Sequence, residues 1–426
     1  MGNQRRFLFL QGPHGPFYRQ LAATLRQAGC DVWRVGFNAG DAAFWWFDRG
    51  YLPFRDDLAA WPAALAGILG EKQITDIVLY GDTRPIHAEA IRQARAAGLR
   101  IHVFEEGYLR PYWVTYERGG SNGHSDLMHL SVPLMQENMT QAGVDLPTPP
   151  AHWGDMRQHI FYGALYHWFV MFTNWRYPQF TPHRALPILR EAQLYSLRLL
   201  MLPFHALSRG LATARIKLRG KPYHLALLQL EHDSSFQTHS PFTDMRDFID
   251  VVIAGFARGG KTDHHLVFKA HPLENGRHKL PQVIRQIAAQ HGLSGRVHYV
   301  RGGKLARLLD GAKSAVTVNS TAGQQVLWRG IPLRIFGTAV YDKPEFVSHQ
   351  PLPAFFADPR TPDAAAYRDY RQFLLETSQV PGGYYAAKGR RQLTRQVVTM
   401  MLAPDDPYSA RLATTQTAPD ALRKVG

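Results

Sequence analysis

The chain has 426 residues, a length that fits two or three domains of ordinary size. Apolar residues make up 45% of it and aromatic residues 12%, which excludes a wholly disordered chain. Lys and Arg number 49 against 34 Asp and Glu, so the net charge of +15 favours anionic partners such as phosphate esters, anionic lipid or nucleic acid. The single cysteine, Cys30, excludes a disulfide within the chain and argues against a cysteine-based zinc site.

The first 110 residues alternate short apolar strands with helical segments. We expect strands at 6–11, 31–37, 75–80 and 100–104, with helices at 17–28 and 86–97. Strand, helix and strand joined by glycine-rich turns predict a parallel sheet with right-handed crossovers.

The second half repeats this alternation. We expect strands at 224–230, 265–270, 297–300, 315–318 and 332–336, and helices at 244–256, 281–291, 304–311, 321–329, 364–379 and 390–402. The pattern predicts an α/β chain with an N-terminal Rossmann-like domain at 1–150 and a C-terminal one at 222–405. Residues 406–426 resemble a flexible tail, because they are rich in Thr, Ala, Pro and Asp.

Residues 151–221, between the halves, are helical in pattern. They contain an aromatic run at 161–175 and a segment at 188–218 in which arginines alternate with leucines. One interpretation is a helical insertion with a solvated basic face, and the other is an amphipathic surface that rests on anionic lipid. No window holds the roughly 20 apolar residues that a membrane-spanning helix needs.

Ligands of a doubly wound sheet bind at the carboxyl ends of its strands, and two strand ends of the first half carry unusual groups. Gly12-Pro13-His14-Gly15 follows the first strand, and its backbone amides suit either an anion or a tight turn. It is not a GxGxxG motif, so the nicotinamide and flavin fingerprint is absent. Glu105-Glu106-Gly107 follows the strand at 100–104, and one of these carboxylates suits general acid or base catalysis, although two solvated glutamates are the alternative.

Three strand ends of the second half are also polar. Lys269 and His271-Pro272 end one strand, where the proline directs the imidazole outward, toward a phosphate that it could bind and protonate. Asn319-Ser320-Thr321 joins a strand to a helix and suits an anion site or an ordinary helix cap. Gln229 and Asp233 follow the first strand of this half, which places Asp233 near a cleft between the halves.

These motifs resemble those of known glycosyltransferases. A Glu-Glu-Gly tripeptide in one Rossmann-like half, with a His-Pro and a Ser-Thr pair in the other, is similar to GT-B glycosyltransferases that use CMP-activated sugars. The narrower motifs resemble the capsule polysaccharide biosynthesis family, and they are Gln11-Gly12-Pro13, Glu106-Gly107-Tyr108-Leu109-Arg110-Pro111, Asn122-Gly123 and Gln229 with Asp233-Ser234. The resemblance covers most of residues 5–345, and the chain has the length of a single-module member.

The resemblance implies a GT-B fold, in which two Rossmann-like domains face a central cleft, and a retaining β-Kdo transferase. Such enzymes use CMP-Kdo and begin an oligo-Kdo linker on lysophosphatidylglycerol in the inner membrane. It further implies that Glu106 is the general acid/base, that His271, Ser320 and Thr321 hold the CMP portion, and that Asp233 is the nucleophile of a double displacement. The chain departs from the family pattern at Ser235, where members commonly have Gln.

The other expected substrate contacts are Gln11, Gly12, Pro13, Glu105, Gly107, Arg110, Gln229, Lys269, Pro272 and Asn319. We expect no metal or other cofactor, since such enzymes neutralise the leaving phosphate with His and helix N-termini and the sequence has no Asp-X-Asp triplet. Expected partners are CMP-Kdo, the lipid acceptor and other capsule biosynthesis or export proteins, at the cytoplasmic face of the inner membrane.

Three alternatives remain open. The first is a non-catalytic component of a capsule export assembly, which the intact set of strand-end residues argues against. The second is a transferase for another CMP-sugar, such as sialic acid. The third is a nucleic-acid binder, which the absence of a Lys/Arg run or an RNA-binding motif argues against, so we expect no nucleic-acid partner.

Overall fold

The computed structural model describes residues 4–45, 48–111, 113–139, 156–181, 202–274, 279–301 and 304–416. The chain forms two compact units. Unit 1 contains residues 1–183 together with 371–426, and unit 2 contains residues 184–370. Among the described residues, no helix combines the length and the hydropathy of a membrane span.

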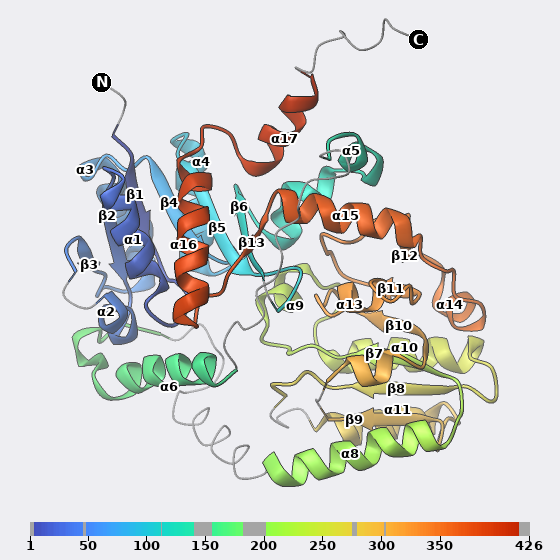
Figure 1. Cartoon of the computed structure of the whole chain (residues 1–426). Coiled ribbons are helices and arrows are strands. Elements are labelled where there is room, and N and C mark those ends of the chain that lie inside the picture. Colours follow the sequence, from blue (N-terminus) through green and yellow to red (C-terminus); the bar gives the residue numbers. More distant parts are fainter. Residues whose placement is uncertain are drawn as a thin grey trace, which may run out of the picture. The chain divides into compact units, whose positions relative to one another are not determined.

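Unit 1 is built on a seven-stranded sheet with the order β13-β6-β5-β4-β1-β2-β3 (Figure 1). β1 to β5 are parallel, whereas β6 runs antiparallel to both β5 and β13. The strands are β1 (Arg6–Phe9), β2 (Asp31–Gly36), β3 (Tyr51–Pro53), β4 (Asp76–Tyr80), β5 (Arg100–Glu106), β6 (Trp113–Arg118) and β13 (Gln379–Pro381). The predicted parallel sheet is therefore confirmed for β1 to β5. The antiparallel strands β6 and β13 extend it, because the chain turns back after Glu106 to form a hairpin.

The helices of unit 1 cover both faces of this sheet. They are α1 (Phe17–Gln27), α2 (Ala39–Trp45), α3 (Trp61–Glu71), α4 (Pro85–Ala96), α5 (Val132–Glu137), α6 (Met156–Phe172), α16 (Ala387–Leu402) and α17 (Pro407–Gln416), with 3₁₀ turns at Leu58–Ala60, Asn122–His124, Asp126–His129 and Asn174–Arg176. Successive β1 side chains point to opposite faces, which divides the core into two layers. Phe7 and Phe9 pack with α1 and α16, while Leu8 and Leu10 pack on the other face with residues of α3 and α4.

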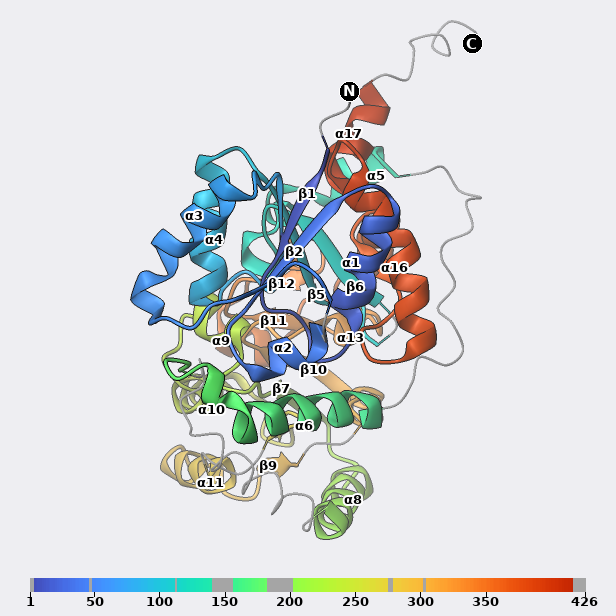
Figure 2. The same ribbon diagram turned by 90° about the vertical axis from the view of Figure 1, so that its left-hand side faces the viewer.

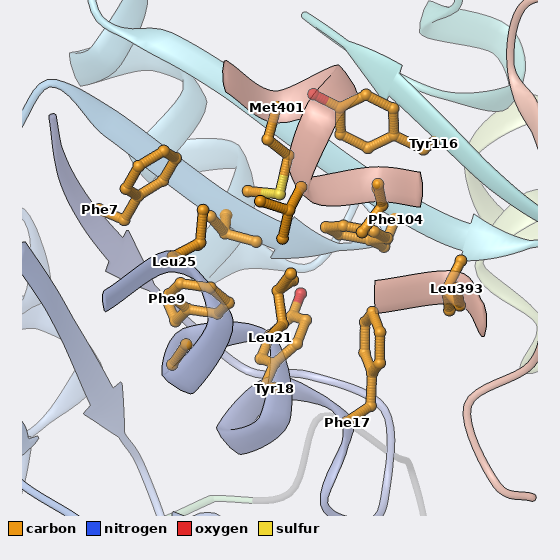
Figure 3. Packing of buried hydrophobic residues seen from close by; sticks show 14 of the residues in the cluster. Phe7, Phe9, Phe17, Tyr18, Leu21, Leu25, Phe104, Tyr116, Leu393 and Met401 are labelled. Carbon is orange, nitrogen blue, oxygen red and sulfur yellow. The ribbon is translucent and has the colours of Figure 1, made fainter. Parts of the chain in front are cut away.

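The C-terminal segment belongs to unit 1, contrary to the expected boundary at residue 405. β13 extends the sheet next to β6, and α16 packs beside α1. Figure 3 shows Leu393 and Met401 of α16 on the same side of the sheet as Phe9, Tyr18 and Phe104, and all five belong to one buried cluster. This burial of apolar surface explains why the chain returns to the first sheet.

Unit 2 is built on a six-stranded parallel sheet with the order β12-β11-β10-β7-β8-β9. Its strands are β7 (Tyr223–Leu227), β8 (His265–Lys269), β9 (Val297–Val300), β10 (Ala312–Thr317), β11 (Leu333–Ile335) and β12 (Val347–Ser348). Its helices are α8 (Leu202–Leu218), α9 (Ser234–His239), α10 (Met245–Gly259), α11 (Leu280–Gln290), α12 (Ala306–Leu309), α13 (Gly323–Leu327) and α14 (Leu352–Ala357), and α15 (Ala364–Glu376) leads the chain back to unit 1. Its main core joins Phe248 of α10 and Ile284 of α11 to Phe268 of β8.

Both units are doubly wound α/β units, and a pair of Rossmann-like units is the architecture of the GT-B class, so the expected fold class is confirmed. That the two units face a central cleft stays a prediction. Two further boundaries are corrected. The helical region expected at 151–221 is divided, since α6 contacts α2 of unit 1 and α8 contacts β9 of unit 2; residues 151–155 and 182–201 lie outside the described residues.

The flexible tail expected from residue 406 instead begins with helix α17. The helix is anchored by Tyr408, whose buried hydroxyl donates a hydrogen bond of 2.5 Å to Glu117 of β6. Residues 417–426 of the expected tail lie outside the described residues.

Candidate active site

The strand order of unit 1 reverses between β1 and β4, and this is the edge where ligands of such sheets bind. Gln11, just past β1, is buried at this point. Its amide nitrogen donates to Asp41 at 3.2 Å, and its amide oxygen accepts from Arg84 at 3.2 Å. Asp41 in turn accepts from Arg34 at 3.1 Å. These contacts form a buried chain of polar groups that fixes the position of the Arg84 guanidinium.

Arg84 lies at the edge of a pocket of about 130 Å³. Gln11 also lines this pocket, and the apolar part of its wall includes Phe37, Phe54 and Phe180. Within the described ranges, Arg84 makes no ion pair with a carboxylate, and it donates its hydrogen bond to the neutral Gln11 amide. A guanidinium held in this way retains its charge for an anionic ligand, and a phosphate is a matching group.

In the turn after β1, the backbone at Gly12 lies directly against the ring of Tyr18. A Cβ atom at Gly12 would lie 2.5 Å from the ring of Tyr18, so only glycine fits. Pro13 is buried beside it. His14 stacks on Tyr166 of α6 with ring centroids 4.3 Å apart. The expected anion-binding turn is therefore packed between α1 and α6, and Gly12 and Pro13 shape it.

Glu105 and Glu106, at the end of β5, have different surroundings. The Glu105 carboxylate accepts a hydrogen bond from the backbone amide of Glu106 at 3.0 Å. The Glu106 carboxylate accepts from the hydroxyls of Tyr80 at 3.1 Å and Tyr385 at 3.4 Å. Burial, and then the negative charge of Glu106, raise the pKa of both phenols well above the usual value, so they stay protonated donors. Glu106 is thus the carboxylate held by side chains in a position suited to proton transfer.

His159 of α6 completes this group. Its ring stacks on Tyr385 with centroids 4.3 Å apart and an angle of 6° between the planes. Burial lowers the pKa of His159, while the charge of Glu106 acts in the opposite direction. The imidazole is therefore neutral at pH 7 and lies beside the Tyr385 hydroxyl that Glu106 binds.

Gly107 and Arg110 belong to the turn between β5 and β6. A Cβ atom at Gly107 would overlap the backbone carbonyl of Trp113, so the hairpin requires glycine there. The exposed Arg110 side chain donates to the Gly107 carbonyl at 3.3 Å. Tyr108, in the same turn, donates to the buried Glu117 of β6 at 2.6 Å. Glu117 therefore anchors the turn that carries Glu106.

The strand order of unit 2 reverses between β7 and β10. Gln229 follows β7 and Asn319 follows β10, and the two amides bind each other directly. The Gln229 amide nitrogen donates to the Asn319 side chain at 2.8 Å, and the Asn319 backbone amide donates back to the Gln229 oxygen at 3.0 Å. The expected residues meet at the expected ligand-binding edge of this sheet.

Lys269 and His271 are at the carboxyl end of β8, the strand next to β7. Lys269 is buried as the last residue of the strand, paired in register with Leu227. The His271 Nδ1 atom accepts a hydrogen bond from the Leu273 amide at 3.1 Å across the Pro272 turn. Because Nδ1 is an acceptor, the imidazole carries its proton on Nε2, which makes Nε2–H a donor suited to a phosphate oxygen.

Ser320 and Thr321 lie before α13, which begins at Gly323, two residues later than expected. The expectation that they cap this helix directly is wrong, because its N-cap is Ala322. The Ser320 hydroxyl instead accepts from the Ala322 amide at 3.2 Å, and the Ser320 carbonyl accepts from Tyr341 at 2.5 Å. These bonds hold the Ser-Thr turn next to Asn319.

Asp233 is exposed at the start of α9 and makes no side-chain capping bond there. Two residues later, the Ser235 carbonyl accepts from the Asn319 side chain at 2.8 Å, which ties the start of α9 to the end of β10. The turn that bears Asp233 is therefore joined to the Gln229–Asn319 pair within unit 2.

The structure thus gathers the expected residues into two sets, one at the carboxyl edge of each sheet. Sequence reasoning missed Tyr80, Arg84, His159 and Tyr385. Arg84 and Tyr80 had a signal, since both flank the end of β4, which corresponds to the strand expected at 75–80. His159 and Tyr385 are far from Glu106 in the sequence, and no local pattern marks them.

Comparison with known proteins places the chain in a family. The model of the family described as "Capsule polysaccharide biosynthesis protein" matches residues 75–385. The chain is 31% identical over 386 residues to the capsule polysaccharide export protein KpsS of Escherichia coli, with 89% of this chain and 97% of that protein covered. It is 31% identical, with 89% and 91% covered, to the capsule polysaccharide modification protein LipB of Neisseria meningitidis serogroup A.

Among solved structures, the chain is similar to Thermosulfurimonas dismutans KpsC, beta Kdo 2,7 transferase. The sequence identity is 10%, the TM-score is 0.46, and 93% of this chain and 100% of that chain are covered. The family match spans more than half of the chain, and the KpsS relative is covered almost completely. The chain therefore belongs to the capsule polysaccharide biosynthesis family.

Proposed function

We propose that the protein is a retaining β-Kdo transferase, which moves Kdo from CMP-Kdo to lysophosphatidylglycerol and so starts the oligo-Kdo linker of a capsular polysaccharide. The observation that carries the proposal is the position of family residues at the point of strand reversal in each sheet: Gln11, which binds Arg84, in unit 1, and Gln229, which binds Asn319, in unit 2. A structural or export component would have no need of a held carboxylate such as Glu106 at this edge.

We assign the binding of the donor substrate, CMP-Kdo, to unit 2. In this proposal, Nε2–H of His271 and the Ser320 and Thr321 hydroxyls bind the CMP phosphate and ribose, with Lys269 adding positive charge nearby. Gln229 and Asn319 position the loops that carry them. Cationic and hydrogen-bonding groups stabilise the leaving phosphate, so we propose that no metal ion is required.

Two displacements give retention. A carboxylate oxygen of Asp233 attacks C2 of Kdo while the bond from C2 to the phosphate oxygen breaks, and CMP leaves with both bonding electrons. The acceptor hydroxyl oxygen then attacks C2, Glu106 takes its proton, and the bond from C2 to Asp233 breaks. Each step inverts C2, so the product keeps the configuration of the donor.

We assign the binding of the lipid acceptor to unit 1. The glycerophosphate of the lipid carries one negative charge, which matches the Arg84 guanidinium that Gln11 holds. The apolar wall of the same pocket suits the glycerol and the start of an acyl chain. This acceptor places the enzyme on the cytoplasmic face of the inner membrane, next to other proteins of capsule synthesis and export.

The test is a transfer assay with purified protein, CMP-Kdo generated in situ and fluorescent lysophosphatidylglycerol, with product mass as the readout. We expect one added Kdo, and a loss of at least 100-fold in rate for Glu106→Gln and Asp233→Asn. Glu105→Gln is run beside them, because it changes the neighbouring carboxylate, and we expect it to lose less rate than Glu106→Gln; the opposite order would move the acid/base role to Glu105.

The outcomes separate the alternatives. Normal turnover by Asp233→Asn removes this residue as nucleophile. Transfer from CMP-sialic acid but not from CMP-Kdo identifies a different CMP-sugar transferase. Failure to transfer either sugar, together with no binding of CMP, favours the non-catalytic component of the export assembly.

A further inference from the structure

The segment 156–181 of unit 1 has an outer face of large apolar side chains that the described part of the chain leaves exposed. Phe161 is 59% exposed, Trp168 49% and Phe172 61%, and Trp175, just past the helix, is 74% exposed. Phe161, Trp168 and Phe172 are separated by seven and four residues, so they lie on one face of α6. Apolar groups of this size are normally buried, and a row of them indicates a binding surface.

The charge of this segment is suited to an anionic partner. Residues 156–181 contain no Asp or Glu. Exposed arginines stand at both ends of the apolar row, Arg157 near the start of α6 and Arg176 after its end, where the guanidinium lies 4.8 Å from the Trp175 ring centroid. Tryptophan, phenylalanine and arginine in this arrangement are typical of helices that lie in the headgroup region of a membrane.

The inner face of the same helix lies on the candidate active site. The Tyr166 hydroxyl accepts from Asn38 at 2.7 Å, and the Tyr166 ring stacks on His14 of the turn after β1. Seven residues earlier on α6, and so on the same face, His159 stacks on Tyr385, which binds Glu106. Figures 1 and 2 both show α6 running past α2 at this edge of unit 1.

We propose that the outer face of α6, with Trp175 and the flanking arginines, docks unit 1 on an anionic lipid bilayer. An α-helix with its side chains is about 10 Å across, so docking would hold the rings that α6 contacts, His14 and Tyr385, about one helix diameter from the headgroups. The proposal rests on the proposed function only in that the acceptor is a membrane lipid; the docking surface itself is argued from α6.

The first experiment measures cosedimentation of the full-length protein with large unilamellar vesicles. The vesicles contain phosphatidylcholine alone or phosphatidylcholine with about one third phosphatidylglycerol, and the triple variant Phe161→Ser/Trp168→Ser/Phe172→Ser is compared with the unchanged protein. We expect the unchanged protein to prefer the anionic vesicles, and the triple variant to bind them at least 10-fold more weakly. Thermal melting checks that the variant is folded, which exposed positions should allow.

A matched control is available in unit 2. Helix α8 also carries three exposed apolar side chains at helical spacing, Phe204, Leu211 and Leu218. The triple serine variant of these residues should keep vesicle binding if α6 is the docking surface. Loss of binding in this control, with retention in the α6 variant, would overturn the proposal. So would a size-exclusion result in which the unchanged protein is a dimer that the α6 variant separates, since the face would then bind a second copy.

A second measurement separates docking from catalysis. Transfer is compared with lysophosphatidylglycerol embedded in vesicles and with a short-chain analogue dissolved below its critical micelle concentration. The α6 variant should lose rate with the embedded acceptor and keep it with the dissolved one. Equal loss with both acceptors contradicts docking, whereas the absence of any transfer refutes the proposed function and leaves the sedimentation result to decide on the surface.

Discussion

The buried carboxyl group of Glu117 should make the stability of unit 1 fall as the pH rises. It lies on β6, fully buried, and accepts hydrogen bonds from the hydroxyls of Tyr108, Ser125 and Tyr408. Burial raises the pKa of Glu117 from its ordinary 4.5 to about 7, although the three hydroxyl donors act in the opposite direction. The folded chain therefore binds this proton more tightly than the unfolded chain does.

The direction and the size of the change in unfolding free energy with pH follow from this difference in pKa between the folded and the unfolded chain. Below pH 4.5 both states are protonated and the group costs nothing. Between pH 4.5 and 7 only the unfolded state ionises, so the free energy of unfolding falls by about 1.4 kcal/mol per pH unit. Above pH 7 the loss levels at about 3 kcal/mol. Glu117→Gln cannot ionise, so its stability relative to the unchanged protein should rise by about this amount between pH 4.5 and 8.

Thermal melting at several pH values measures the effect. At pH 5 the protonated carboxyl and the Gln amide are nearly alike in size, so their difference there gives the cost of rearranged hydrogen bonds. Relative to that offset, the remaining loss of about 2.5 kcal/mol should raise the melting temperature of Glu117→Gln by about 5–10 °C at pH 8. Other titrating groups, such as the buried His102–Asp76 pair, are common to both proteins and cancel. Parallel melting curves for the two proteins across this range would refute the reasoning.

Three further changes test the site. Gly107→Ala should destabilise unit 1 by about 3 kcal/mol or more in denaturant titration, because its Cβ would overlap the Trp113 carbonyl; Gly119→Ala, at an open turn, should cost less. Tyr385→Phe should lower kcat about 10-fold without raising KM for CMP-Kdo, since it removes one hydroxyl from Glu106; an unchanged kcat would deny this contact a role. Arg84→Ala should raise KM for the lipid acceptor at least 10-fold and leave CMP binding intact, whereas the opposite pattern would place the donor phosphate at this pocket.

Local patterns predicted the strand ends that carry the site, because a buried parallel strand ends where its apolar run meets glycine and polar residues. This holds for Glu106 at the end of β5 and for Gln229 and Asn319 after β7 and β10. The order of the strands then brings Gln229 and Asn319 together across 90 residues of sequence. The pattern could identify these residues, but the hydrogen bonds between them are a consequence of the topology.

Other elements were not predicted from the sequence, because the features that determine them are not visible in a local pattern. β6 has the alternation and aromatic content of a strand, but it lies among turn residues and polar groups, and the strands expected in the first half end at residue 104. α16 and β13 return to unit 1 because a distant aromatic layer offers them apolar surface, which no local window of sequence reveals. α17 is held by the buried Tyr408 hydroxyl and by the ion pair of Arg411 with Glu376, in a segment whose composition is typical of a flexible tail.

The same long-range contacts give the C-terminal segment a place in the chemistry. Tyr384 donates to the Glu105 carbonyl at 2.8 Å and Tyr385 to the Glu106 carboxylate, so the residues that fix both glutamates come from the far end of the chain. Tyr408 fixes Glu117, which in turn holds the Tyr108 turn next to Glu106. Because Glu106 is held from these C-terminal positions, a truncation before residue 384 should abolish transfer even if both sheets still form. Addition of the missing segment as a separate peptide would restore it only if those tyrosines bind in their present places.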